Sequence, residues 1–382
     1  MQNISLKMLV RYGQNADGKQ VRQALVYTKN EHSIERKKVD AEAVKIIQRL
    51  NSQGFEAYIV GGAVRDMLIG KTPKDFDIAT SAEPSKIRRI FRNSRIIGKR
   101  FRLVHVFFGE KIYEVCTFRS TEDGTVGNKF GTIYEDVHRR DFTLNALYYD
   151  PINELIIDYV GGVKDIMAKK IKPIIPLPVI FAEDPVRILR AIKYAAITNS
   201  KIPFFVQMQI KKNSHLLEFV SPSRMTEEIN KIIFSGHSLD IVKILLHYRI
   251  YVYMQPGACA FIDSSEQFKE EYFESLKNLD TKLSEKHISK QGICLKALLF
   301  DYIKLIANPE GIPQEVYMQV YPECRHFILP MNPQRRELEF AVKSCLNDLG
   351  IKVAMERSAS VSQNTNSNTA TKKRRKKKKA SV

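Results

Sequence analysis

The sequence predicts an α+β protein in which a mixed α/β head is followed by an all-helical neck and body. Short apolar strands alternate with amphipathic helices up to about residue 180, whereas strand patterns are scarce beyond that point. Hydrophobic residues make up 44% of the 382 residues, which is enough for more than one buried core. The expected segments are an N-terminal extension (1–36), the head (37–178), the neck (179–237), the body (238–356) and a disordered basic tail (357–382).

The individual elements are predicted from periodicity and from the residues that flank each run. Apolar side chains at helical spacing indicate helices, and short apolar runs bounded by glycine indicate strands. In the head, helices are expected at 40–50, at 63–69 and from a cap at Thr80 or Ser81 to about Phe91, with strands at 57–60, 75–79, 103–108 and 111–118 and a mobile loop at 120–131. In the neck and body, helices are expected at 184–197, 223–234, 238–249, 266–282 and 290–307.

The chain is strongly basic. It carries 61 Lys and Arg residues against 42 Asp and Glu, a formal net charge of +19. The run KKRRKKKK at 372–379 supplies eight of the positive charges, and the rest of the excess is spread along the chain. Because Lys and Arg that neutralise phosphates release counterions, this charge predicts a polyanionic partner. A soluble basic protein without such a partner would have the same composition.

The cysteines and the apolar runs bear on the cellular compartment. Five scattered cysteines with no CxxC spacing argue against a disulfide framework or a zinc site, and they favour a reducing compartment. The N-terminal residues MQNISLKMLVRYGQ lack the apolar run of a signal peptide, and no apolar stretch is long enough for a membrane helix. We therefore expect a cytoplasmic protein with no membrane partner.

Two aspartates at 75 and 77, in the segment KDFDIA, form a candidate metal site. Alternate side chains of a strand share a face, so Asp75 and Asp77 are expected to point the same way. Neighbouring carboxylates repel each other unless a cation lies between them, and Mg²⁺ prefers oxygen ligands of this kind. Asp-x-Asp is also common in surface turns, so this pair alone does not establish a metal site.

A glycine pair precedes the aspartates in VGGAVRDML at 60–68. Gly61 and Gly62 stand between a predicted strand and a predicted helix, where a backbone without side chains lets a phosphate approach closely. Arg65, in the first turn of the helix, is placed to add a charge-assisted contact. An ordinary tight turn explains the glycines equally well.

The combined order of strand, Gly-Gly, helix, loop and Asp-x-Asp resembles the nucleotidyltransferases of the DNA polymerase beta superfamily. The resemblance is to the class II branch, which contains bacterial poly(A) polymerases and CCA-adding enzymes, and it covers residues 32–235. It implies that Gly61 and Gly62 cradle the triphosphate of the incoming nucleotide with Arg65 as a phosphate ligand. It also implies that Asp75 and Asp77 hold the metal ions, Mg²⁺ or Mn²⁺.

Two further segments resemble blocks of the same family. YEV at 113–115 is similar to the strand that bears the third carboxylate, which makes Glu114 a candidate. DVHRRDFTLNALYYD at 136–150 is similar to the family's RRDFTxNAL block, which implies that Arg140 contacts the nucleotide and that Asp141 supports the metal site. Whether Glu114 or Asp141 lies closer to the metals stays open from the sequence.

FAEDPVRILRAIKYA at 181–195 is predicted to be a helix with Asp184 as its N-cap and Pro185 as its first residue. The segment resembles the EDxxRxxR block of class II enzymes, which selects the base through hydrogen bonds to its Watson–Crick edge. Asp184 and Arg187 would then contact the base, with Arg190 nearby. Lys193 occupies a position that is often arginine in the family, and a lysine there lacks the bidentate geometry.

The resemblance implies a metal-dependent, template-independent transfer of AMP from ATP to the 3′ ends of single-stranded RNA. A lead-in at 32–62, the basic segment RIIGKRFRLVHVFFG at 95–109 and the basic tail favour the poly(A) polymerases. CCA addition to tRNA is the alternative, and a non-catalytic RNA-binding protein on the same scaffold is a further one. We expect a monomer whose basic tail holds RNA, and the sequence names no protein partner.

Overall fold

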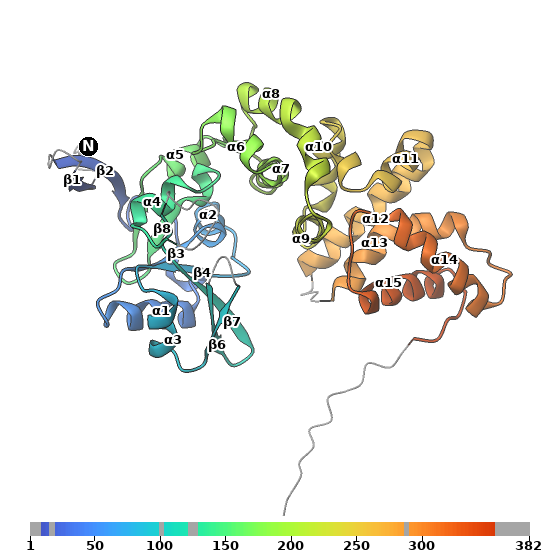
Figure 1. Ribbon diagram of the computed structural model, residues 1–382, viewed down its shortest axis with the longest axis horizontal. Helices are drawn as coiled ribbons and strands as arrows, with labels where there is room; N and C mark the ends of the chain where they lie inside the picture. Colours follow the sequence, from blue (N-terminus) through green and yellow to red (C-terminus); the bar gives the residue numbers. More distant parts are fainter. Residues whose placement is uncertain (1–8, 15–19, 99–102, 121–128, 286–289, 356–382) are drawn as a thin grey trace, which may run out of the picture.

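The computed structural model describes residues 9–14, 20–98, 103–120, 129–285 and 290–355. A mixed α/β head lies at one end of the molecule and a group of helices at the other, with α6 to α10 between them (Figure 1). All described elements from residue 177 onward are helices, which confirms the predicted fold class. The basic tail, most of the expected loop at 120–131 and residues 99–102 of the basic segment lie outside the described residues.

The head is built on a sheet whose described strands run in the order β1-β2-β9-β8-β3-β4-β7-β6-β5. Strands β4 and β7 are parallel, and the other neighbours are antiparallel. The strands are β1 (Leu9–Gln14), β2 (Gln20–Tyr27), β3 (Ala57–Val60), β4 (Asp77–Thr80), β5 (Ser94–Ile97), β6 (Leu103–Phe108), β7 (Lys111–Thr117), β8 (Leu147–Asp150) and β9 (Leu155–Asp158).

Short helices connect these strands. They are η1 (Arg36–Lys38), α1 (Ala41–Asn51), α2 (Gly62–Leu68), α3 (Pro84–Ile90), α4 (Ile133–His138), η2 (Thr143–Asn145) and α5 (Gly162–Met167), where η denotes a 3₁₀ helix. The helix expected from Thr80 or Ser81 begins later, at Pro84, because both residues remain tied to Glu56 beside the sheet. The Thr80 hydroxyl donates to the Glu56 carbonyl, and the Ser81 hydroxyl accepts from the Glu56 N–H.

Two strands in the first 36 residues differ from the expected N-terminal extension with little periodicity. β2 pairs with β9 through Leu25, Val26 and Tyr27, so this part of the chain belongs to the head sheet. β1 pairs with β2 and contains an irregularity in register between Arg11 and Tyr12. Leu9 and Tyr12 of β1, at the edge of the sheet, are exposed, so the apolar residues of this strand do not alternate as in a half-buried strand.

The neck and body are formed by α6 (Leu177–Glu183), α7 (Val186–Thr198), α8 (Phe204–Asn213), η3 (Ser214–Phe219), α9 (Pro222–Ile233), α10 (Ser238–His247), η4 (Tyr251–Tyr253), α11 (Pro256–Ser264), α12 (Glu266–Glu285), α13 (Gln291–Ile306), α14 (Pro313–Phe327) and α15 (Arg335–Asp348). The five predicted helices correspond to α7, α9, α10, α12 and α13. Within the described ranges, each helix is too short or too polar to cross a bilayer.

The core explains why β3 is a continuous apolar run. Ile59 belongs to the main hydrophobic cluster, which continues into the neck and body, whereas Tyr58 and Val60 belong to a smaller cluster on the other face of the sheet. A strand that is buried on both faces needs apolar side chains at every position. This burial places the end of β3, and the glycine turn that follows it, in the middle of the head.

Candidate active site

The glycine turn joins β3 to α2. Gly61 has φ +69° and ψ −131°, a backbone conformation that residues with a side chain rarely adopt. A Cβ atom at Gly61 would lie 3.8 Å from Arg140 Nη1, and one at Gly62 would lie 3.5 Å from Arg65 Nη2. The structure therefore brings Arg65, the predicted phosphate ligand, and Arg140, which was predicted to contact the nucleotide, to the turn.

Arg140 is held by a buried polar network. Its Nη2 lies 2.9 Å from Asp136 Oδ2, and its Nη1 donates to the Asn145 carbonyl at 3.1 Å. The Tyr148 hydroxyl also donates to Asp136. Burial opposes the charged form of Asp136, but Arg140, Arg139 and Tyr148 together bring its pKa well below the usual range. No role was predicted for Asp136 from the sequence. Asp136 lies in α4 and Arg140 follows four residues later, just beyond the helix, and opposite charges at this spacing indicate an ion pair.

Arg65 lies under the turn and contacts the neck. Its Nη1 donates to Asn145 Oδ1 at 2.9 Å, and its Nε and Nη2 donate to Asp66 Oδ1 at 2.9 and 2.7 Å. The guanidinium also lies 5.2 Å from the ring centre of Tyr194 on α7. Arg65 is only 6% exposed, so these contacts restrain it strongly. Its predicted role as a phosphate ligand stays a prediction.

Asp77 lies beside the glycine turn. It is the first residue of β4 and pairs with Val60, the residue that precedes Gly61. β4 is parallel to β7 with Ile78 opposite Val115, which brings Glu114 to the same end of the sheet. The pKa of Asp77 is raised to about 6, chiefly because neighbouring protein atoms displace water around the carboxylate even though the residue is exposed, with further contributions from the Glu114 and Asp75 carboxylates.

Asp75 lies just outside the strand in which it was predicted. The strand begins at Asp77 because the preceding segment turns toward the neck, where Lys74 Nζ donates to the Phe234 carbonyl at 3.0 Å. Asp75 and Asp77 are nevertheless both exposed, while Phe76 between them is buried. The pattern of exposure is compatible with a common face for the two aspartates, which stays a prediction because Asp75 lies outside the strand.

These carboxylates have the chemistry of a site for a hard divalent cation. The side chains of Asp75 and Asp77 form no hydrogen bond or ion pair with any described residue. The charge of Arg140 favours the ionised form of Asp77, but it does not outweigh desolvation and the repulsion from Asp75 and Glu114, so a bound cation would relieve the remaining repulsion. Within the described ranges, no group of three or more His, Cys, Asp or Glu side chains is close enough to form a preassembled metal cluster. The two aspartates are therefore the ligands that the residues support, with Glu114 as their nearest acidic neighbour on β7.

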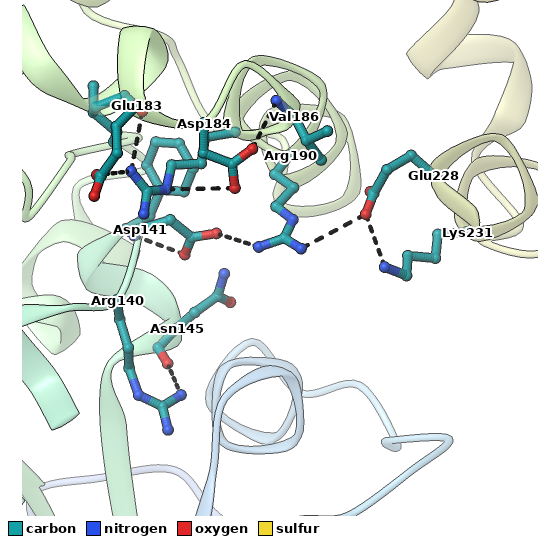
Figure 2. Close-up of polar contacts among 12 residues, drawn as sticks. Arg140, Asp141, Asn145, Glu183, Asp184, Val186, Arg190, Glu228 and Lys231 are labelled. Carbon is teal, nitrogen blue, oxygen red and sulfur yellow. Dashed lines mark hydrogen bonds and ion pairs between the residues drawn. The ribbon is translucent and has the colours of Figure 1, made fainter. Parts of the chain in front are cut away.

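Asp141 points away from this group. Its Oδ1 accepts the Phe142 N–H, and its Oδ2 lies 3.5 Å from Arg190 Nη1 on α7 (Figure 2). The structure thus places Glu114 beside Asp77 and Asp141 against the neck. The catalytic role of either residue stays a prediction.

Asp184 lies in the short connection between α6 and α7. The helix begins at Val186, one residue later than expected, because Pro185 occupies the cap position. The Asp184 side chain still accepts the Val186 N–H at 3.2 Å, and its other oxygen accepts Arg224 Nη2 at 2.7 Å. The carboxylate therefore has a fixed orientation at the start of α7.

Arg187 and Arg190 have different surroundings. Arg187 Nη1 donates to Glu183 Oε2 at 2.6 Å and to the Ile180 carbonyl at 3.1 Å, which ties it to α6. Arg190 lies between Asp141 of the head and Glu228 of α9, at 3.5 and 3.6 Å (Figure 2). Arg190 thus links the head, α7 and α9 in one chain of charges.

Two residues of α9 were missed from the sequence. Arg224 contacts Asp184, and the nearly buried Glu228 contacts Arg190 and Lys231. Arg224 and Glu228 are four residues apart, so the sequence could have shown that they share one face of the helix. It could not have shown that they contact Asp184 and Arg190. Lys193 of α7 lies close by, and burial is the main cause that lowers its pKa to about 8.

Comparisons with known proteins agree with this arrangement. The family model "Poly A polymerase head domain" matches residues 57–172, and the model "Probable RNA and SrmB- binding site of polymerase A" matches residues 202–262. The first segment contains the glycine turn, the aspartates and the Arg140 network. The second contains α8 to α10 and therefore Arg224 and Glu228.

Relatives of known name cover most of the chain. Poly(A) polymerase I of Escherichia coli O6:H1 is 38% identical over 332 residues, which are 82% of this chain and 71% of that protein. The CCA-adding enzyme of Bacillus pumilus is 34% identical over 55% of this chain and 54% of its own. A solved structure titled "tRNA-processing enzyme (apo form 2)" is 26% identical with a TM-score of 0.57, covering 80% of this chain and 81% of that one. Because the identity to a poly(A) polymerase extends over more than two thirds of both proteins, the chain belongs to the poly(A) polymerase family of nucleotidyltransferases.

Proposed function

We propose that the protein transfers AMP from ATP to the 3′-hydroxyl end of single-stranded RNA without a template, and that it releases pyrophosphate. The observation that carries this proposal is the meeting of Asp77, Glu114 and the glycine turn at one end of β3, β4 and β7. A triphosphate seated on Gly61 and Gly62 would lie next to the carboxylates. The longer match to the poly(A) polymerase than to the CCA-adding enzyme supports adenylate addition.

In the proposed reaction, the RNA 3′ oxygen forms a bond to the α-phosphorus of ATP, and the bond from that phosphorus to the pyrophosphate oxygen breaks. Asp75 and Asp77 would hold Mg²⁺ or Mn²⁺, which lowers the pKa of the attacking hydroxyl and neutralises the leaving group. The remaining contribution of the chain is positioning and charge stabilisation, which requires no nucleophilic side chain.

Recognition of adenine is proposed for the start of α7. The Watson–Crick edge of adenine offers an amino donor and a ring nitrogen acceptor. A carboxylate accepts hydrogen bonds and a guanidinium donates them, so Asp184 and Arg187 are complementary to that edge. Asp184 is already oriented by Arg224 and by the Val186 N–H, which limits its reorganisation when a nucleotide binds.

One assay tests the reaction. The protein is incubated with Mg²⁺ and either ATP or CTP, using oligo(A) RNA and a tRNA that lacks its 3′ terminus. A long adenylate ladder on oligo(A) is expected. A short addition that stops and requires CTP would instead identify a CCA-adding enzyme, and an RNA-binding protein without activity would give no product.

The metal site is tested in the same assay. We expect Asp77→Asn to lower the rate by about three orders of magnitude, whereas Glu110→Gln, an exposed acid in the turn before β7, serves as the control. Glu114→Gln should raise the Mg²⁺ concentration needed for half-maximal rate if Glu114 assists the metals. Asp141→Asn should leave that concentration unchanged, because Asp141 faces Arg190.

We further propose a cytoplasmic monomer. All five cysteines are free thiols, as a reducing compartment would favour. Light scattering on the purified protein tests the oligomeric state, and a mass of twice the chain would contradict it.

A further inference from the structure

A pocket of about 550 Å³ lies at the surface between the first residues of α9 and the connection from α14 to α15. Such a volume is typical of sites for nucleotide-sized ligands. The lining residues that matter below are Pro222, Tyr321, Arg325, Leu329, Met331 and Arg335. All of these except Pro222 lie outside both matched family segments.

The walls of the pocket are fixed by hydrogen bonds to neighbouring helices. The Asn332 N–H donates to Thr226 Oγ1 of α9 at 2.8 Å. Gln255 Nε2 donates to the Ile328 carbonyl at 3.2 Å, and Met331, which lines the pocket, is buried. The connection between α14 and α15 is thus held from both ends, so a ligand would meet a preformed surface.

Two guanidinium groups in the pocket are poorly neutralised. The Arg325 side chain is exposed and forms no hydrogen bond or ion pair with any other residue that the structure describes. Arg335 donates from its Nε to Glu339 at 2.7 Å, which leaves both of its terminal nitrogens without a described partner. The described residues that line the pocket include these two arginines and no acid, which favours an anionic ligand, and the guanidinium fork suits phosphate oxygens.

An aromatic face lies beside these charges. Tyr317, Tyr321 and Arg325 are spaced four residues apart on α14, so they share one face of that helix. The rings of Tyr317 and Tyr321 are 5.7 Å apart, and Lys343 Nζ of α15 lies 5.1 Å from the Tyr317 ring. Aromatic rings interleaved with cations are the usual platform for single-stranded nucleic acid.

We propose that this pocket binds a nucleotide of the RNA substrate upstream of the 3′ end, with its phosphate at Arg325 and Arg335 and its base against Tyr321. The proposal rests on the function proposed above in taking RNA as the substrate. Pro222 lines the pocket, and Arg224, two residues further along α9, holds Asp184. One turn of α9, which stands between head and body (Figure 1), therefore joins the pocket to the nucleotide site.

Binding of labelled oligo(A) of increasing length to the full-length protein tests this site. In the wild type, affinity should rise sharply at the length that first reaches the pocket. Arg325→Glu and Tyr321→Leu should each remove that rise, with a loss of about tenfold, and Tyr321→Phe should restore it. The matched control is Arg336→Glu, because Arg336 is exposed on the same helix as Arg335 and does not line the pocket.

Two results would overturn the proposal. An equal loss for Arg336→Glu and Arg325→Glu would mean that only diffuse charge matters. Unchanged affinity of the folded pocket variants at every length, with folding checked by circular dichroism, would mean that the pocket serves another ligand, such as a protein.

The binding experiment is independent of catalysis. If the wild type does not extend RNA but the pocket variants still lose the length-dependent affinity, the proposed function fails while the pocket assignment holds. If RNA is extended normally and the pocket variants bind every length like the wild type, the pocket assignment alone fails.

Discussion

Arg224 donates a hydrogen bond from Nη2 to Asp184 Oδ2 at 2.7 Å, joining two residues that lie 40 positions apart in the sequence. Asp184 is the carboxylate proposed to read the adenine edge, and Arg224 lies on a different helix. The orientation of the proposed base-reading group therefore depends on the packing of α9 against α7. This relationship makes α9 part of the proposed nucleotide site.

Loss of Arg224 should weaken base discrimination. We expect Arg224→Ala to lower the ratio of kcat/KM for ATP over CTP by about tenfold, because a charge-assisted hydrogen bond contributes about 1.5–3 kcal/mol. Arg224→Lys keeps the charge but loses the planar fork, so an intermediate ratio is expected. Steady-state kinetics with both nucleotides measure the ratio. An unchanged ratio in Arg224→Ala would show that Asp184 does not depend on this contact.

The buried Glu228 should contribute to stability as well as to position. It is 2% exposed and lies 2.8 Å from Lys231 Nζ and 3.6 Å from Arg190 Nη2. Removing one partner of such a group leaves uncompensated charge, so Glu228→Gln should lower the free energy of unfolding by about 3 kcal/mol. Urea denaturation measures the change. The adjacent Glu227 is exposed, and Glu227→Gln should change stability by less than about 0.5 kcal/mol.

Lys74 should support catalysis by positioning Asp75, without contacting the substrates itself. Lys74 directly precedes Asp75 in the sequence, and its Nζ donates to the Phe234 carbonyl at the end of α9. Because a small displacement of a metal ligand has a large effect on rate, we expect Lys74→Met to lower the single-turnover rate by about tenfold with little change in ATP affinity. Lys86→Met, at an exposed position on α3, is the comparison. Equal rates for the two variants would count against a positioning role.

Lys193 should make stability depend on pH in the alkaline range. Burial is the main cause that lowers its pKa from 10.5 to about 8, and the charges of Lys231 and Arg190 add to the effect. Between these values the unfolded chain holds a proton that the folded protein has released, so the contribution of Lys193 to stability rises with pH. Below pH 8 both states are protonated, and this dependence ends.

The comparison with Lys193→Met isolates this effect from other titrating groups. Wild-type stability should increase relative to the variant as the pH rises from 8 to 10.5, as measured by urea unfolding below, within and above that window. Lys212→Met on α8, an exposed lysine, should show no such trend. A constant difference between wild type and Lys193→Met across the window would refute the assignment.

Local patterns were sufficient for much of the head. The strand at 57–60 and the glycine turn follow from patterns over a few residues, and the structure agrees with both. The N-terminal hairpin was not predicted, because apolar residues of its edge strand, such as Leu9 and Tyr12, are exposed and produce no alternating pattern.

The sequence by itself determined the fold class, the glycine turn and the identity of the carboxylates and arginines that gather around it. These features depend on neighbours within one helix or one strand. Only the tertiary structure decided that Glu114 lies beside Asp77, that Asp141 faces Arg190, and that α9 supplies the partners of Asp184 and Arg190. The physical reason is that these contacts join elements distant in sequence, and their geometry is set by how the sheet pairs and how the helices pack.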